Sequence, residues 1–237
     1  MENQRQENRK TQFKHDMKTK SLLILLFMIA LTNTGKPQGV KGFGLKTGIS
    51  VANHKWNYSE SYLDKVYKYS PSSVVFFNIG VFGEFLNTEY VSTVIDFWYT
   101  SKGADFKYDS KDMYGNKIGT EKVENRLRYF SFSLTEKFRL ESRRQGFGIY
   151  LAAGPRVDLL LSRSYDIDFT GVYEHSSATT FGLALAGGFS FMLTGSRVLF
   201  ELFCNPDFSK TVDNSHGYVK NYDYGIRVGF EGILKKK

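Results

Sequence analysis

The sequence predicts an all-β protein, an eight-stranded antiparallel up-and-down transmembrane β-barrel, from three observations. Long segments alternate apolar residues with small or polar ones, the period-2 pattern of β-strands that have one apolar face. The links between these segments are alternately short and long. The non-apolar face carries charges of both signs among Gly, Ala and Ser. Such faces suit a narrow barrel that turns its apolar side to lipid and its charges inward.

The clearest strand runs from Gly146 to Ser162. Its length exceeds the ~9–11 residues that a tilted strand needs to cross a bilayer. One face is small, with Arg156 and Asp158 near its middle. The other face is apolar throughout and consists of Phe147, Ile149, Leu151, Ala153, Pro155, Val157, Leu159 and Leu161.

Seven further segments repeat this design. Glu136 is an exception, because it falls on an apolar face. In chain order the predicted strands are Phe43 to Val51, Val74 to Phe85, Tyr90 to Lys102, Leu127 to Leu140, Gly146 to Ser162, Thr180 to Leu193, Arg197 to Asn205 and Asn221 to Leu234.

The connections support a membrane barrel. Outer-membrane barrels have short periplasmic turns and longer extracellular loops. The even number of strands predicts that both ends of the barrel domain lie on the periplasmic side. The short links are Leu86–Glu89, Glu141–Gln145 and Thr194–Ser196, and the long ones are Ala52–Ser73, Gly103–Arg126, Arg163–Thr179 and Pro206–Lys220.

The charged residues of the non-apolar face are predicted to fill the interior of the barrel. An eight-stranded barrel is just wide enough for side chains to fill, and Arg pairs well with carboxylates. We therefore expect a structural charge network that plugs the lumen; a proton relay or acid/base set built on the same groups is the alternative. The network comprises Lys46, Glu84, Asp96, Lys137, Arg139, Arg156, Asp158, Glu201, Arg227 and Glu231.

The first part of the chain predicts export. Residues 1–38 combine a basic start with the apolar run Ser21 to Leu31, typical of a signal peptide, and Met17 is an alternative initiator. The run is shorter than the ~20 residues of a spanning helix. Residues 39–237 then form the barrel domain, which we expect in the cell outer membrane after export.

Composition argues against several kinds of site. Cys204 is the single cysteine, which excludes an internal disulfide or a multi-cysteine metal site. The formal charge of +8 includes seven Lys/Arg and three Asp/Glu within residues 1–38, so the remainder carries only +4 and indicates no nucleic-acid binding. No catalytic motif or phosphate-binding loop is present, and we expect no catalytic, cofactor or metal residues.

The predicted loops hold the remaining candidates. Histidine occurs at His15, His54, His175 and His216, the last three in different predicted loops. The first loop is rich in aromatic residues that could form a recognition surface or a girdle at the lipid interface. These aromatic residues are Trp56, Tyr58, Tyr62, Tyr67 and Tyr69.

The sequence resembles the PorT-like outer-membrane β-barrel family of Bacteroidota, which shares its architecture with small OmpA/OmpX-type barrels. The segment Ala153 to Leu160 is similar to the family's A-G-P strand, and Ile95 to Gly103 is similar to its E-L-x-Y-x-x-K-G stretch with Asp96 in place of Glu. Tyr129 to Lys137 matches less well, because Ser131 and Ser133 replace Glu and Pro. The resemblance implies a barrel in the outer membrane and no particular activity, although the eponymous member is linked to protein secretion.

The predicted function is that of a non-enzymatic outer-membrane barrel with a plugged polar lumen, whose long loops bind or scaffold a partner. A link to protein secretion or envelope maintenance follows from the resemblance. Expected partners are outer-membrane lipid, the barrel-insertion machinery and an extracellular or envelope protein. Two alternatives remain: a lipid-modifying enzyme using His54, His175 or His216, and a secreted lipocalin-like barrel that carries an apolar ligand.

Overall fold

A computed structural model describes residues 39–58, 71–85, 88, 90–114, 116–142, 146–165, 176–214 and 217–234. The predicted signal peptide lies outside the described residues. The barrel falls within one compact unit, Gln38–Lys237. Among the described residues, no helix is long and apolar enough to cross a membrane.

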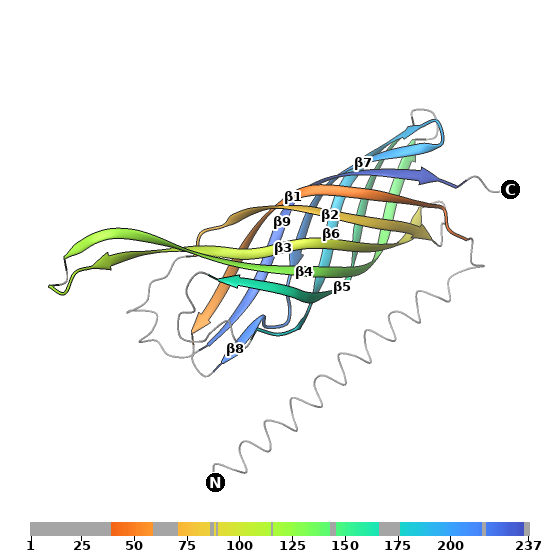
Figure 1. The fold of residues 1–237 in the computed structure, drawn as a ribbon. Helices are drawn as coiled ribbons and strands as arrows, with labels where there is room; N and C mark the ends of the chain where they lie inside the picture. Colours follow the sequence, from red (N-terminus) through yellow and green to blue (C-terminus); the bar gives the residue numbers. More distant parts are fainter. Residues whose placement is uncertain are drawn as a thin grey trace, which may run out of the picture. The chain divides into compact units, whose positions relative to one another are not determined.

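The described chain forms a closed antiparallel barrel (Figure 1). Neighbours in sequence pair in order, and β1 pairs with β9 from Gly42↔Ile233 to Tyr58↔Gly217, which closes the barrel. The eight predicted strands are therefore present, and one short extra strand, β8, pairs with β9. The strands are β1 (Gly42–Tyr58), β2 (Val74–Phe85), β3 (Val91–Lys111), β4 (Lys117–Ser142), β5 (Phe147–Tyr165), β6 (Thr179–Leu193), β7 (Ser196–Pro206), β8 (Val212–Asn214) and β9 (Gly217–Ile233).

The burial pattern shows which face is inside. Leu202 is 67% exposed and Phe77 is 64% exposed, whereas Glu84 is fully buried. Since large apolar side chains cover the outside, the barrel presents a surface suited to lipid. Exposed apolar residues on β1, β2, β7 and β9 are Phe43, Leu45, Ile49, Val75, Phe77, Ile79, Val81, Phe200, Leu202, Tyr224, Ile226, Val228 and Phe230. An apolar carrier would need the opposite arrangement.

Glu136 lies on the outward face, as its sequence parity predicts. Its Oε1 accepts a hydrogen bond from the Thr93 hydroxyl at 2.8 Å. Thr93 is directly opposite Glu136 in the β3–β4 ladder. The cross-strand partner thus satisfies part of the carboxyl group at this half-buried position.

The tight turns depend on glycine. Gly146, before β5, has φ = 61°, and Gly195, between β6 and β7, has φ = 79°. Residues with a Cβ adopt such angles at a cost, so these positions favour Gly. No atom lies within 4 Å of a Cβ built on Gly195. Its requirement is therefore conformational.

The β3–β4 hairpin differs from the prediction. The segment Gly103–Arg126 was expected to be a loop, but β3 and β4 remain paired up to Ser110↔Gly119 and Lys111↔Lys117. Figure 1 shows this hairpin continuing past the neighbouring strands. The sequence signal was missing because a ribbon in water needs no continuous apolar stripe, although its backbone hydrogen bonds continue.

The Gly154–Pro155 step interrupts one side of β5. The β4–β5 ladder is broken between Ser133↔Arg156 and Glu136↔Ala153. Proline has no N–H to donate to a ladder. On its other side, Pro155 still pairs with Leu183 of β6. Without a Cβ, Gly154 lets β5 approach the backbone of β4 closely at this point.

Candidate functional site: the ion-paired interior of the barrel

All ten residues predicted for the charge network lie on inward-facing strand positions. Nine are buried, and Arg227 is half-buried. They come from β1, β2, β3, β4, β5, β7 and β9, so the network draws on nearly the whole wall. Their contacts divide into three clusters along the barrel, which we call the turn-side, middle and loop-side clusters.

The turn-side cluster is centred on Glu84 of β2. Glu84 Oε1 lies 3.1 Å from Lys41 Nζ and 2.5 Å from Arg139 Nη1, and Glu84 Oε2 lies 3.1 Å from Lys137 Nζ. Arg197 Nη1 lies 3.9 Å from Glu84 Oε2. One fully buried carboxylate therefore holds several cations from β4, β7 and the start of the barrel. The cluster consists of Lys41, Glu84, Lys137, Arg139, Arg197 and Glu231, the last paired with Arg197 at 3.2 Å.

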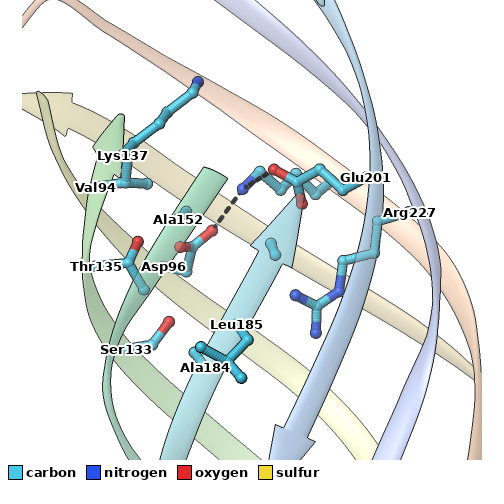
Figure 2. A pocket seen from close by; sticks show the side chains of 12 residues that line it. Val94, Asp96, Ser133, Thr135, Lys137, Ala152, Ala184, Leu185, Glu201 and Arg227 are labelled. Carbon is cyan, nitrogen blue, oxygen red and sulfur yellow. Dashed lines mark hydrogen bonds and ion pairs between the residues drawn. The ribbon is translucent and has the colours of Figure 1, made fainter. Parts of the chain in front are cut away.

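The middle cluster bridges the lumen. Lys46 Nζ of β1 lies 3.0 Å from Asp96 Oδ1 of β3 and 2.9 Å from Glu201 Oε1 of β7 (Figure 2). The Tyr150 hydroxyl also donates to Glu201 Oε1, at 3.0 Å. Lys46 therefore links two carboxylates from strands that are not neighbours.

Arg227 lies directly opposite Glu201 in the β7–β9 ladder, and its guanidinium also lies on two aromatic rings. Its guanidinium carbon lies 3.5 Å from the Phe203 ring centroid and 4.0 Å from that of Trp98. A guanidinium on an aromatic face gains cation–π attraction, and more when it is desolvated. The middle cluster is Lys46, Asp96, Glu201 and Arg227.

The loop-side cluster joins two cations to three carboxylates. Lys102 Nζ lies 2.6 Å from Asp158 Oδ2, 3.0 Å from Asp207 Oδ1 and 3.6 Å from Asp223 Oδ1. Arg156 contacts the same three carboxylates through Asp158 at 3.1 Å, Asp223 at 3.8 Å and a short pairing with Asp207. Such sharing meets the requirement that buried charges be paired.

The charge balance changes along the barrel. The turn-side cluster has four cations and two carboxylates, and the middle cluster has two of each. The loop-side cluster has two cations and three carboxylates. The described interior therefore carries excess positive charge toward the short turns and excess negative charge toward the long loops.

Sequence reasoning missed five members of these clusters: Lys41, Lys102, Arg197, Asp207 and Asp223. Lys102 and Asp223 share parity with the predicted Asp96 and Arg227, so the period-2 pattern was sufficient to include them. Asp207 follows Pro206, beyond the predicted end of its strand. Its backbone bridge to Gly182 holds it inside the barrel wall.

A smaller ion-paired group lies at the base of the β3–β4 extension. Asp105 Oδ1 lies 2.6 Å from Arg126 Nη1, and Asp105 Oδ2 lies 2.9 Å from Lys122 Nζ. Burial alone raises the pKa of Asp105, but hydrogen bonds from Arg126 and Lys122 outweigh it and hold the pKa below its ordinary value. The pKa of Lys122 is raised by hydrogen bonds to Glu124 and Asp105.

Two small cavities lie among the clusters. The first has a volume of about 20 Å³ and is shown in Figure 2, lined by residues that include Asp96, Lys137, Glu201 and Arg227. The second, of about 10 Å³, is lined by Lys102, Arg156, Asp223 and Arg227, among others. A cavity needs ~10–15 Å³ to hold one water, so each has room for about one.

The histidine and aromatic candidates are placed differently from the prediction. His54 is not in a loop: it lies in β1, which extends to Tyr58, and it is buried. Trp56 and Tyr58 are also in β1, where Trp56 pairs with Val219 and Tyr58 with Gly217. The first loop was predicted too long because the polar end of β1 lacks an apolar stripe. The candidates outside the described residues are His15, Tyr62, Tyr67, Tyr69, His175 and His216.

Within the described part of the chain, no group of three or more His, Cys, Asp or Glu residues is arranged to hold a metal ion. Lys102 and Arg156 explain this for the loop-side carboxylates, because both cations already occupy the space between them. The arrangement favours internal ion pairing over metal coordination.

The chain is similar, at low sequence identity, to several solved structures. Neisserial surface protein A is 14% identical, covering 83% of this chain and 100% of that chain with a TM-score of 0.46. OprG from Pseudomonas aeruginosa is 12% identical, covering 83% and 99% with a TM-score of 0.47. Outer membrane protein W from E. coli is 12% identical, covering 80% and 99% with a TM-score of 0.34. No curated protein matches the chain.

The family comparison covers nearly the whole barrel. Residues 41–232 match the model of a family described as "Outer membrane protein beta-barrel domain". This range includes β1 to β8 completely and all but the last residue of β9. The protein belongs to this outer-membrane β-barrel family, and its place is the outer membrane.

Proposed function

We propose that the protein is a non-enzymatic integral outer-membrane barrel with a plugged lumen, which uses its loop side to bind or scaffold an extracellular or envelope partner. The observation that carries the proposal is the set of three ion-pair clusters across the interior. Lys46 joins β3 to β7, and Lys102 contacts carboxylates of β5, β9 and the residue after β7. The cavities between them have room for about one water each.

Conductance in planar bilayers tests the plug. The full chain, purified in detergent and shown to be β-rich and heat-modifiable, should insert without a steady ion conductance. Opening the lumen for hydrated ions would require several buried ion pairs to separate together. Leaving one charge of a buried pair without its partner costs about 3–5 kcal/mol. A large, steady conductance from the folded protein would refute the plugged lumen.

The β3–β4 extension supports the binding role. At its tip, Met113 is 87% exposed and Tyr114 is 82% exposed. Asp112 Oδ1 accepts hydrogen bonds from the backbone N–H groups of Tyr114 and Asn116, which orders this turn. An ordered projection with exposed apolar and aromatic side chains has the composition of a recognition surface.

Capture of envelope and surface proteins tests this role. The intact chain and a variant in which a tight turn replaces residues 106–122 would be compared as baits in matched amounts. We expect the intact chain to retain a partner that the shortened chain loses, while both remain heat-modifiable barrels. Equal capture by the two baits would rule out the extension as the binding surface.

The export route, the membrane insertion and the cellular role of the protein are also proposals. We propose export through a signal peptide within residues 1–38, insertion by the barrel-insertion machinery, and a PorT-like role in protein secretion or envelope maintenance. The segment Ala153 to Leu160, with its Gly154–Pro155 step, supports this relationship. Deleting the encoding gene should impair secretion or envelope integrity, and a deletion strain that is normal in both would contradict the role.

A further inference from the structure

We infer that the plugged interior contains a water-bridged proton relay, which runs along the inward face of β4 and joins the loop-side cluster to the turn-side cluster. This goes beyond the proposed function, because a plug needs only to block the lumen. The relay would pass protons and exclude ions. Three features of the interior support it: a row of hydroxyl groups, the two cavities and unpartnered polar atoms.

The hydroxyl row consists of Ser131, Ser133 and Thr135, which take successive inward positions on β4 and are buried. Residues two apart in a strand are about 6.8 Å apart. A hydroxyl–hydroxyl hydrogen bond spans only about 2.8 Å, and one bridging water extends this to about 5.6 Å. Neighbouring hydroxyls are therefore too far apart for direct contact, and a single water bridges them when the two side chains lean about 1 Å toward each other.

The two cavities lie along this row. Ser133 and Thr135 line the first cavity, and Ser131 and Ser133 line the second. Both cavities also share Ala184 of β6 and Arg227 of β9. Small side chains on β6 thus leave space opposite the hydroxyl row. Because each cavity has room for about one water, the path is one water wide.

Unpartnered polar atoms point to water at the same places. Glu201 Oε2 and Arg227 Nε are buried without a hydrogen-bond partner among the described residues, and so is Asn205 Oδ1. Glu201 lines the first cavity, Asn205 lines the second, and Arg227 lines both. Buried polar groups without a protein partner are the usual ligands of internal water.

The ends of the row meet the outer clusters. Lys137 lines the first cavity, and its Nζ lies 3.1 Å from Glu84 in the turn-side cluster. Lys102 and Arg156 line the second cavity within the loop-side cluster. A proton that enters at the loop-side carboxylates passes through water and hydroxyl groups to Glu201 or Asp96. Lys137 then donates one of its protons to Glu84 and takes a proton back from the first cavity, so that Lys137 is again an ammonium group. Glu84 releases its proton on the turn side and is again a carboxylate.

Ion exclusion follows from the same geometry. A permeating K⁺ would have to pass Lys46, which is fixed between Asp96 and Glu201 at about the middle of the lumen. The cavities leave no room for a hydrated ion. Protons need only hydrogen-bonded neighbours. The structure therefore predicts proton transfer without ion conductance.

Proton flux into liposomes tests the relay. The full chain would be reconstituted into phosphatidylcholine vesicles that enclose a pH-sensitive dye, and a K⁺ gradient with valinomycin would drive protons. We expect a flux several-fold above that of protein-free vesicles. Ala184→Val, which adds two carbon atoms beside both cavities, should reduce the flux to near the protein-free level.

Two further variants make the result specific. Ala153→Val adds the same atoms on the outward face of β5 and should leave the flux unchanged. Ser133→Ala removes one hydroxyl with little change in volume and should lower the flux even if Ala184→Val fails to fold. Flux at the protein-free level with the unaltered chain, equal flux in all variants, or K⁺ entry without valinomycin would each overturn the relay.

Discussion

At the scale of single residues, Glu84 links several cations of the charged interior. It contacts Lys41, Lys137 and Arg139 directly, and it is fully buried. Glu84→Gln should lower the free energy of unfolding by about 3–5 kcal/mol, because it leaves buried cations without their counter-charge. Urea unfolding in phospholipid vesicles measures this change.

Glu136→Gln is the matched control for Glu84→Gln. Glu136 lies on the outward face of the same barrel and retains its hydrogen bond from Thr93 when neutral. Its substitution should change the free energy of unfolding by less than about 1 kcal/mol. Equal losses in the two variants would mean that the interior ion pairs contribute nothing specific to stability.

Residue faces could be predicted from the sequence, but residue partners could not. Period-2 alternation is sufficient to place Lys46, Asp96 and Glu201 on one side of their strands. It contains no information on which carboxylate Lys46 reaches, because that depends on the stagger and tilt of strands around the closed barrel. Asp96 and Glu201 lie on β3 and β7, with β4, β5 and β6 between them.

At the scale of strands, Gly154 controls the approach of β5 to β4. A Cβ at this position would lie 2.0 Å from the Leu134 carbonyl oxygen and 2.7 Å from Thr135 Cα, both backbone atoms. Gly154→Ala should therefore destabilise the barrel by about 2–3 kcal/mol through overpacking. At Gly119, in the β3–β4 extension, an added Cβ would have no atom within 4 Å.

Gly119→Ala is accordingly the control for Gly154→Ala, and we expect a change of about 0.5 kcal/mol or less. The fraction of folded protein after refolding into vesicles, read from heat-modified mobility at increasing urea, compares the two variants. If Gly154→Ala were as stable as Gly119→Ala, the close contact between β4 and β5 would not be a constraint on the fold.

The β3–β4 extension should depend on pH through Asp105. An Asp in an unfolded chain titrates near 3.9, and the pKa of folded Asp105 lies lower. Its ion pairs therefore contribute their full stability above about pH 4 and lose it as the pH falls through the folded pKa. Titration of the Asp105 carboxyl carbon by NMR in micelles measures this pKa.

Arg126→Gln should move the pKa of Asp105 upward toward its ordinary value, because it removes the 2.6 Å contact. Arg128→Gln changes the next outward residue of β4, which is exposed, and should leave that pKa in place. An Asp105 pKa that does not respond to Arg126→Gln would show that another group holds it low.

The strands themselves were predicted well where lipid imposes a pattern and poorly beyond it. The bounds predicted for β2 match the structure, and those of β6 and β7 differ by one residue at one or both ends. The predicted bounds of β1, β3 and β4 were too short on the side of the long loops, where these strands continue farther than the sequence indicated. There the outward residues include Lys55, Lys107 and Lys122, which are suited to water and break the apolar alternation.

At the scale of the whole molecule, the fold is decided by which face meets which solvent. The same alternation could be satisfied by a soluble barrel with an apolar core. The interior here contains ion-paired groups such as Glu84 and Arg197, while Phe77 and Leu202 lie outside. Only an apolar surrounding stabilises this arrangement, since burying charge and exposing hydrocarbon are both unfavourable in water.

The position of the molecule in the bilayer can be tested with two substitutions on one strand. Ile79 lies near the middle of the outward face of β2, and Val75 lies near its loop-side end; both are at least half exposed. Ile79→Arg should cost about 2–4 kcal/mol in a bilayer, and Val75→Arg only about 0–1 kcal/mol, because the penalty falls from midplane to interface. Unfolding in vesicles compares the two. Equal, small effects would show that this face is surrounded by water and would exclude the lipid-facing orientation on which the interior charge network depends.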